Sequence, residues 1–204
     1  PWLWLSPYIA AWTCAVAASA DDATELNGNM TVAGVTLNAN STTQFIGLRF
    51  PSCPIPNGST INSAVITVDV QNNTNDDPDL NIKCQLGNAA QFAATSNDIT
   101  NRSKTTSSTQ WTESSILSGT HNTPNFAATL EEAVSHGSWA ANQALGVFFL
   151  PRQNSSALTI FAHDNGSRYV TIWVDYTEPA SGDGAMSKTA RTRLATKVGG
   201  LLTA

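Results

Sequence analysis

Short stretches in which apolar and polar residues alternate recur along most of the chain and predict β-strands. The clearest lie in segment 45–70, FIGLRFPSCPIPNGSTINSAVITVDV, where three prolines forbid a helix and Asn57-Gly58 favours a turn with positive φ. After that turn, apolar residues fall largely on one face of a second, long strand: Ile61, Ala64, Ile66, Val68 and Val70. The segment therefore predicts two strands of a β-sandwich.

Further strands are predicted at the intervals that are typical of a sandwich. Residues 145–150, LGVFFL, form an uninterrupted apolar run, which predicts a central strand buried on both faces. The one helical candidate covers 125–136, where apolar residues recur at three-to-four spacing until Gly137 ends the pattern. The predicted strands cover 13–25, 30–37, 43–50, 60–71, 80–86, 105–111, 145–150, 158–162 and 169–176.

Segment 47–70 also resembles a family signature. GLRF followed by IPNGSTINSAVITVDV is similar to the pattern of non-catalytic β-jelly-roll modules found in phage and prophage structural proteins and in secreted multidomain bacterial proteins. Segments 123–139 and 169–176 are similar to later parts of that pattern, so the resemblance covers about residues 19–176. Ser59 departs from it, since the family usually has alanine there. The resemblance implies an all-β fold, a jelly-roll-like antiparallel β-sandwich with one short helix, and a role without catalysis.

Charge and length narrow the class of protein. The 204 residues suit one β-sandwich domain, and only 12% of them are charged. A net charge of −5 argues against nucleic acid as the main partner, and no apolar run is long enough to span a membrane. Residues 9–18 imitate a signal peptide, but no positive charge precedes them, which favours synthesis and assembly in a cytoplasm over an extracellular location.

The two terminal segments differ in composition from the rest, which divides the chain into 1–12, 13–177 and 178–204. The first is a Trp-rich arm, PWLWLSPYIAAW, that either covers the end of the sandwich or packs against another subunit. The last is a linker and a basic arm with four basic and two acidic residues, a net charge of +2, which would attract an acidic neighbour. The candidate partner-binding residues are Trp2, Trp4, Tyr8, Trp12, Lys188, Arg191, Arg193 and Lys197.

No catalytic constellation is recognisable in the sequence, so we expect a protein that is not an enzyme. The three histidines are not at metal-ligand spacing, and Glu131 and Glu132, adjacent on a predicted helix, should point in different directions. We expect no cofactor. The loop with Asn75, Asp76, Asp77 and Asp79 is either an ordinary polar turn or a structural calcium site.

Two tryptophans and three cysteines leave alternatives open. Trp111 and Trp139 are candidates for glycan binding, or else they belong to the core. Cys53 and Cys84 either form a disulfide or stay reduced together with Cys14.

Two functions follow as expectations. The first is a structural protein of a virus particle, a phage capsid decoration or a tail or head-surface component, located in the virion and bound to other virion proteins and to copies of itself in an oligomer or lattice. The alternative is a carbohydrate-binding module of a cell-surface or secreted protein that recognises a surface glycan.

Overall fold

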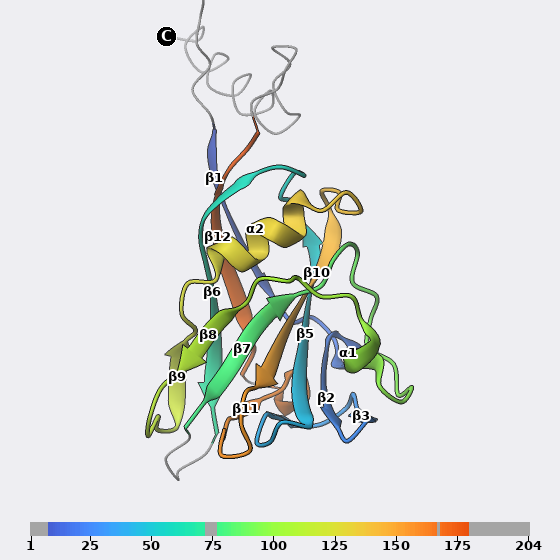
Figure 1. Ribbon diagram of the computed structural model, residues 1–204, viewed down its shortest axis with the longest axis vertical. Coiled ribbons are helices and arrows are strands. Elements are labelled where there is room, and N and C mark those ends of the chain that lie inside the picture. The colour runs from blue at the N-terminus through green and yellow to red at the C-terminus, as the bar shows by residue number, and fades with distance from the viewer. Residues whose placement is uncertain (1–7, 72–76, 167, 180–204) are drawn as a thin grey trace, which may run out of the picture.

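The computed structural model describes residues 8–71, 77–166 and 168–179, which form two antiparallel sheets packed face to face (Figure 1). The predicted all-β sandwich is therefore confirmed. The first sheet has the order β1 (Ile9–Ala15), β12 (Thr171–Thr177), β6 (Thr60–Val70), β11 (Thr159–Phe161) and β4 (Thr36–Asn38), with β9 (Gly119–Asn122) also paired to β6. The second has the order β3 (Asn29–Thr31), β2 (Asp22–Leu26), β5 (Gln44–Cys53), β10 (Gln143–Pro151), β7 (Asp79–Cys84) and β8 (Thr109–Thr112).

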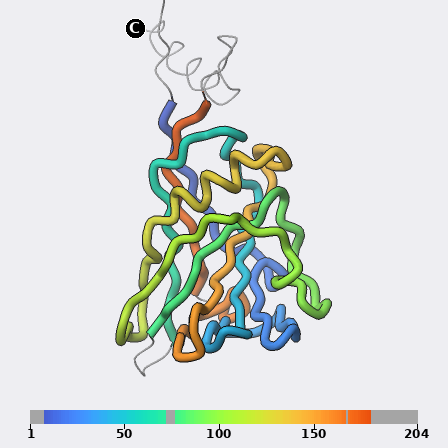
Figure 2. The backbone as a smooth tube through the Cα atoms, viewed as in Figure 1, coloured from blue at the N-terminus to red at the C-terminus, as the bar shows by residue number. Residues whose placement is uncertain are grey.

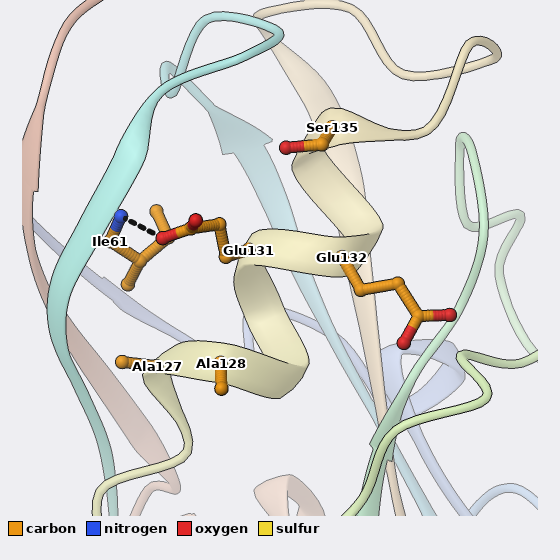
Figure 3. A pocket seen from close by; sticks show the side chains of 6 residues that line it. All are labelled: Ile61, Ala127, Ala128, Glu131, Glu132 and Ser135. Atoms are coloured by element: carbon orange, nitrogen blue, oxygen red, sulfur yellow. Dashed lines mark hydrogen bonds between the residues drawn. The ribbon is translucent and has the colours of Figure 1, made fainter.

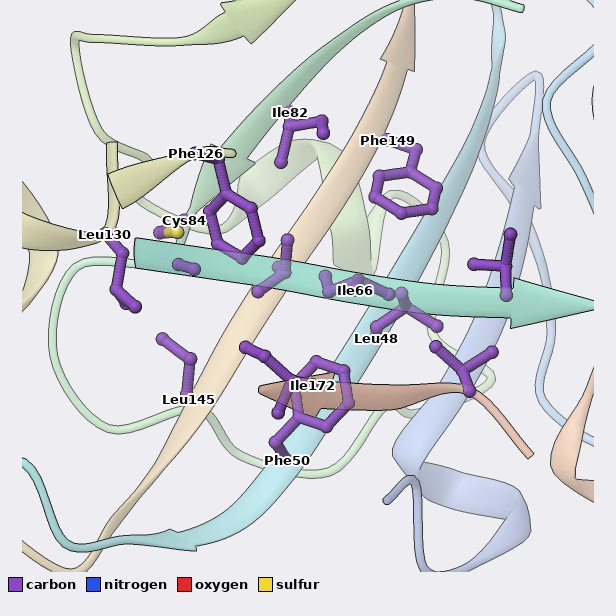
Figure 4. Packing of buried hydrophobic residues seen from close by; sticks show 14 of the residues in the cluster. Leu48, Phe50, Ile66, Ile82, Cys84, Phe126, Leu130, Leu145, Phe149 and Ile172 are labelled. Atoms are coloured by element: carbon purple, nitrogen blue, oxygen red, sulfur yellow. The ribbon is translucent and has the colours of Figure 1, made fainter. Parts of the chain in front are cut away.

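The core lies between the two sheets and is built by the inward residues of the long strands. Alternate residues of β6 are buried, as its sequence pattern predicts. Figure 4 shows Ile66 of β6 beside side chains from the opposite sheet, among them Leu48 and Phe149. Phe149 meets Trp111 edge to face, with ring centroids 5.7 Å apart. Burial of such large apolar side chains is the main force that holds the sheets together.

Strand β10 is buried on both faces, as its uninterrupted apolar run predicts. One face contributes to the core between the sheets, and the other carries Phe148 into a second cluster with Ala23, Phe92 and Ile99. Ile99 belongs to α1 (Asp98–Asn101), a short helix that the apolar pattern does not reveal. The segment that connects β7 to β8 therefore covers the outer face of the second sheet.

Helix α2 (Ala127–Ser135) confirms the helical candidate within two residues at its start. It packs beside β6, and its inward residues Leu130, Ala133 and Val134 are buried. The described chain begins and ends at one end of the sandwich, as Figure 2 shows, where the Glu178 amide donates to the Tyr8 carbonyl at 3.0 Å.

Two strand predictions and one boundary require correction. The stretch 13–25 is divided between β1 and β2 by a 3₁₀-helix, η1 (Ser19–Asp21), and 30–37 is divided between β3 and β4. Strand β9 and a second 3₁₀-helix, η2 (His163–Asn165), lie in segments without a clear pattern. Because β1 begins at Ile9, residues 9–12 belong to the sheet, and the proposed boundary after residue 12 is wrong.

Candidate interaction site

Strand β1 is the longest edge strand in the described part of the chain. It has seven residues, IAAWTCA, whereas β3, β4, β8 and β9 at the other edges have three or four. None of the seven residues is charged or proline. Natural proteins usually protect an edge by making it short, charged or interrupted by proline, because an unpaired edge can accept another strand. The edge of β1 lacks all three protections.

The backbone of β1 points alternately to β12 and away from it. The Glu178 amide donates to the Tyr8 carbonyl and the Val16 amide to the Val170 carbonyl, and the register between these two contacts has no bulge. Hydrogen-bonded and non-hydrogen-bonded pairs alternate in antiparallel strands, so the odd-numbered residues direct their N–H and C=O groups away from β12. They are Ile9, Ala11, Thr13 and Ala15.

These outward groups have almost no partners among the residues that the structure describes. β1 pairs with β12 alone, and of the outward backbone groups the Ala15 carbonyl has a further partner, the Cys14 thiol at 3.4 Å. The same thiol also lies 3.5 Å from the Pro51 carbonyl of β5, on the inner side of the strand. Backbone groups without protein partners must bind water or another chain. The outer side of β1 can therefore accept a further strand.

The inner face of β1 continues the core but is incompletely covered. Ala10, Trp12 and Cys14 pack against the core while staying partly exposed. On the same face of the neighbouring strand β12, every inward residue is buried: Ile172, Val174 and Tyr176. The apolar inner face of the first sheet thus ends at β1 with side chains that are still partly exposed. Trp12, a predicted partner-binding residue, is one of them.

The outer face next to this edge carries an exposed tryptophan. Trp173 of β12 is 43% exposed and lies between Thr13 of β1 and Val65 of β6. Ile9, at the start of β1, is 65% exposed. Trp173 was not among the candidate site residues, although the alternation in YVTIWVDY places it opposite the buried Ile172 and Val174 and could have revealed it.

Near α2, β6 has no described strand on the side away from β12. Unlike the edge of β1, this part of β6 has its outward amides bonded to side chains. The Ala64 amide donates to Asn125 Oδ1 at 2.9 Å, and the Ile66 amide donates to Thr123 Oγ1 at 3.0 Å. The Ile61 amide donates to a carboxylate oxygen of Glu131 at 2.9 Å. Side chains therefore occupy the donors that an added strand would need, and this edge is protected.

Glu131 and Glu132 do not form an acid pair. Both line a shallow hollow of about 450 Å³ beside α2. Figure 3 shows Glu131 directed toward Ile61 and Glu132 directed away from it. Glu132 accepts a hydrogen bond from the Ser107 hydroxyl and further bonds from the amides of Thr106 and Ser107 at 2.7 and 2.8 Å. These bonds, that of the hydroxyl above all, lower the pKa of its carboxyl. Each carboxylate thus anchors a neighbouring segment, as adjacent helical positions predict.

The two tryptophans proposed for glycan binding belong to the core. Trp111 has no exposed surface and Trp139 is 4% exposed. Their ring N–H groups donate to Glu113 and to the Ile55 carbonyl, both at 2.9 Å. A sugar needs an exposed ring face on which to stack, so the assignment of Trp111 and Trp139 to glycan binding is wrong.

Within the described residues, no group of three or more His, Cys, Asp or Glu side chains is arranged to hold a metal ion. Two of the four proposed calcium ligands, Asn75 and Asp76, lie outside those residues. Asp77 accepts the Ser115 amide, and Asp79 forms an ion pair with Arg152 at 2.6 Å. Both described carboxylates of the loop, Asp77 and Asp79, therefore bind partners within the protein.

A buried acidic cluster joins the start of β2 to η2. Asp22 is 1% exposed; its Oδ2 accepts the His163 amide at 2.7 Å, while Oδ1 has no partner. His163 Nδ1 and Asp164 Oδ2 are also buried and unpartnered. Burial raises the pKa of the Asp22 carboxyl to about 6, and the neighbouring Asp164 and Asp21 act in the same direction. The neutral form of Asp22 is thus favoured by the fold.

All three cysteines are free thiols, so no disulfide joins Cys53 to Cys84. Burial raises the pKa of Cys53 to about 12 and also raises that of Cys84. These two thiols act as small apolar residues of the core.

No protein-family model matches the sequence, and a search of curated proteins finds no significant match. The family resemblance therefore stays a prediction. No helix in the described part of the chain is long and apolar enough to cross a membrane. Of the proposed partner-binding residues, Tyr8 and Trp12 lie at β1, and the others lie outside the described residues: Trp2, Trp4, Lys188, Arg191, Arg193 and Lys197.

Proposed function

We propose that this chain is a non-enzymatic structural protein of a phage particle, a capsid decoration or a tail or head-surface component that associates through the edge of β1. The observation that carries the proposal is the open, uncharged edge of seven residues, whereas the other edge strands in the described part of the chain have three or four. Such an edge is a liability on a protein that works alone, whereas in an assembly it provides backbone hydrogen bonds to a neighbour. The phage setting rests on the resemblance of segment 47–70.

The edge is one part of a larger surface that suits association. Partly covered Trp12 and exposed Ile9 and Trp173 lie on or next to it. Aromatic residues are enriched at protein interfaces, because they bury a large area while only two side-chain torsions become fixed. Many copies in a particle would multiply contacts that are individually weak.

Sedimentation velocity over a range of protein concentrations tests the association. Ala11→Lys adds a charge at the edge, and Ser63→Lys adds the same charge in the same row of the outer face, two strands away. We expect the wild type and Ser63→Lys to form one defined oligomer and Ala11→Lys to shift toward monomer. A chain that stays monomeric at every concentration, or two variants that behave alike, would contradict association through β1.

The phage setting needs its own experiment. Antibodies raised against the protein should label particles purified from its source, and the protein should be found in those particles by mass spectrometry. Its absence from particles that are otherwise complete would contradict the phage assignment while leaving association through β1 untouched.

The second candidate function is carbohydrate binding, and the exposure of Trp173 favours it. Trp173 lies on the outer sheet face opposite Thr13, with Thr171 and Asp175 two residues away along the same strand and face. Apolar sugar faces stack on such rings, and neighbouring hydroxyl and carboxylate groups can bind sugar hydroxyls. A glycan-array signal that is lost in Trp173→Ala would support this function, whereas an unchanged signal would exclude Trp173 as its platform.

A further inference from the structure

We propose that two copies of this chain pair β1 against β1 in antiparallel orientation about a two-fold axis at Trp12, which joins their first sheets into one continuous sheet. This inference rests on the proposed function and deepens it, because it names the partner and the register at the same edge. Symmetric pairs of this kind use one surface patch twice.

The backbone permits only some registers. Ile9, Ala11, Thr13 and Ala15 direct their N–H and C=O groups to the open side, so an added strand must place its own outward residues opposite them. With Trp12 opposite Trp12, Ala11 faces Thr13 and Ile9 faces Ala15 of the second copy. All four outward residues of each copy are then paired, which makes about eight backbone hydrogen bonds. A shift by two residues in either direction leaves part of the strand unpaired.

The side chains of β1 fit a second copy of the same strand. Trp12 would meet its own counterpart in a non-hydrogen-bonded pair, where Cα atoms are about 4.5 Å apart and side chains are closest. Its neighbours on the inner face are the small residues Ala10 and Cys14, which leave space for two indole rings. The pair would cover the partly exposed apolar row at the edge and extend the core across the two-fold axis.

Charge favours this edge as the place where a second copy pairs. At a net charge of −5 two copies repel each other overall, but β1 itself carries no charge. The residues that face one another across the axis are therefore free of like-charge repulsion. On the outer face, the Trp173 side chains of both copies would lie on the same continuous sheet surface.

Cysteine cross-linking tests the register. Two single variants, Ala11→Cys and Thr13→Cys, are made in a Cys14→Ala background, which removes the partly exposed native thiol; the other two thiols are buried. Cross-strand pairs in an antiparallel sheet have Cα separations of about 4.5–5.5 Å, within the range that a disulfide requires. In the proposed register, Ala11 faces Thr13 of the other copy.

We expect a disulfide-linked dimer when the two variants are mixed and oxidised, at least tenfold more abundant than in either variant alone. Self-linking of Ala11→Cys, or of Thr13→Cys, would overturn the register in favour of one shifted by two residues. No cross-link in a protein that still sediments as an oligomer would overturn the β1 pair and leave the proposed function standing. A protein that is monomeric by sedimentation would overturn both.

Discussion

The substitution Asp22→Asn should stabilise the protein at neutral pH and have little effect in acid. Asp22 is buried, one of its oxygens has no partner, and burial raises its pKa from 3.8 to about 6. At about 1.4 kcal/mol for each pKa unit, the shift corresponds to about 3 kcal/mol of unfolding free energy. Asparagine keeps an acceptor for the His163 amide and cannot ionise.

The direction of the pH effect follows from the raised pKa. Below pH 3.8 Asp22 is protonated in both the folded and the unfolded state, and its contribution to stability is fully present. As pH rises toward 6 the unfolded state releases the proton first, and this contribution is lost. The difference between Asp22→Asn and wild type should therefore be near zero below pH 4 and grow to about 3 kcal/mol above pH 6. For a domain of this size that is about 6–12 °C in Tm.

Thermal unfolding of both proteins between pH 3.5 and pH 8 measures this difference, and titrating groups that do not interact with Asp22 cancel in the comparison. Asp175→Asn, on the outer face of β12, is the matched control and should change the unfolding free energy by less than about 0.5 kcal/mol. If Asp22→Asn changed the unfolding free energy by the same amount at every pH, the Asp22 pKa would be the same in the folded and unfolded states, and the reasoning would be refuted. It would equally be refuted if Asp22→Asn destabilised the protein at neutral pH but not in acid, because the carboxylate would then be favourably bound in the fold.

Three further predictions concern packing, edge protection and thiol accessibility. Gly47→Ala should destabilise by about 1–3 kcal/mol in urea unfolding, because the new Cβ would lie 2.5 Å from the Phe92 ring; equal stability would show that the ring can move. Glu131→Ala should cost about 1–2 kcal/mol by leaving the Ile61 amide without its acceptor, whereas Glu131→Gln should cost less; equal losses would contradict the capping role. Cys14 alone should react with a thiol reagent before unfolding, and modification of all three native thiols at one rate would contradict the burial of the other two.

Local patterns in the sequence predict the parts of this fold in which one face or both faces of an element are buried. The alternation in β6, the apolar run of β10 and the spacing in α2 each reflect contacts that the element must make whatever its partners are. The unrecognised features depend on distant residues. Glu131 caps the Ile61 amide across 70 positions, and the Asp22 cluster is completed by η2, so no local pattern contains either contact.

The candidate site was predictable in part. Trp12 was recognised from the density of aromatic residues, but that same density concealed the alternation of Ala10, Trp12 and Cys14 that makes this segment a strand. Trp111 and Trp173 have similar strand contexts in the sequence. They differ in exposure because Trp111 packs against Phe149 of β10 in the core, whereas Trp173 faces outward from the first sheet.

Site-resolved hydrogen exchange at low and high protein concentration tests the central claim, that β1 is an association edge, most directly. The amides of Ala10, Trp12 and Cys14 bond to β12 and should be protected at both concentrations. The amides of Ala11 and Thr13 should exchange rapidly in dilute solution and become protected as concentration rises. Association that leaves Ala11 and Thr13 in rapid exchange would contradict the claim, because the edge would then still be open in the assembly.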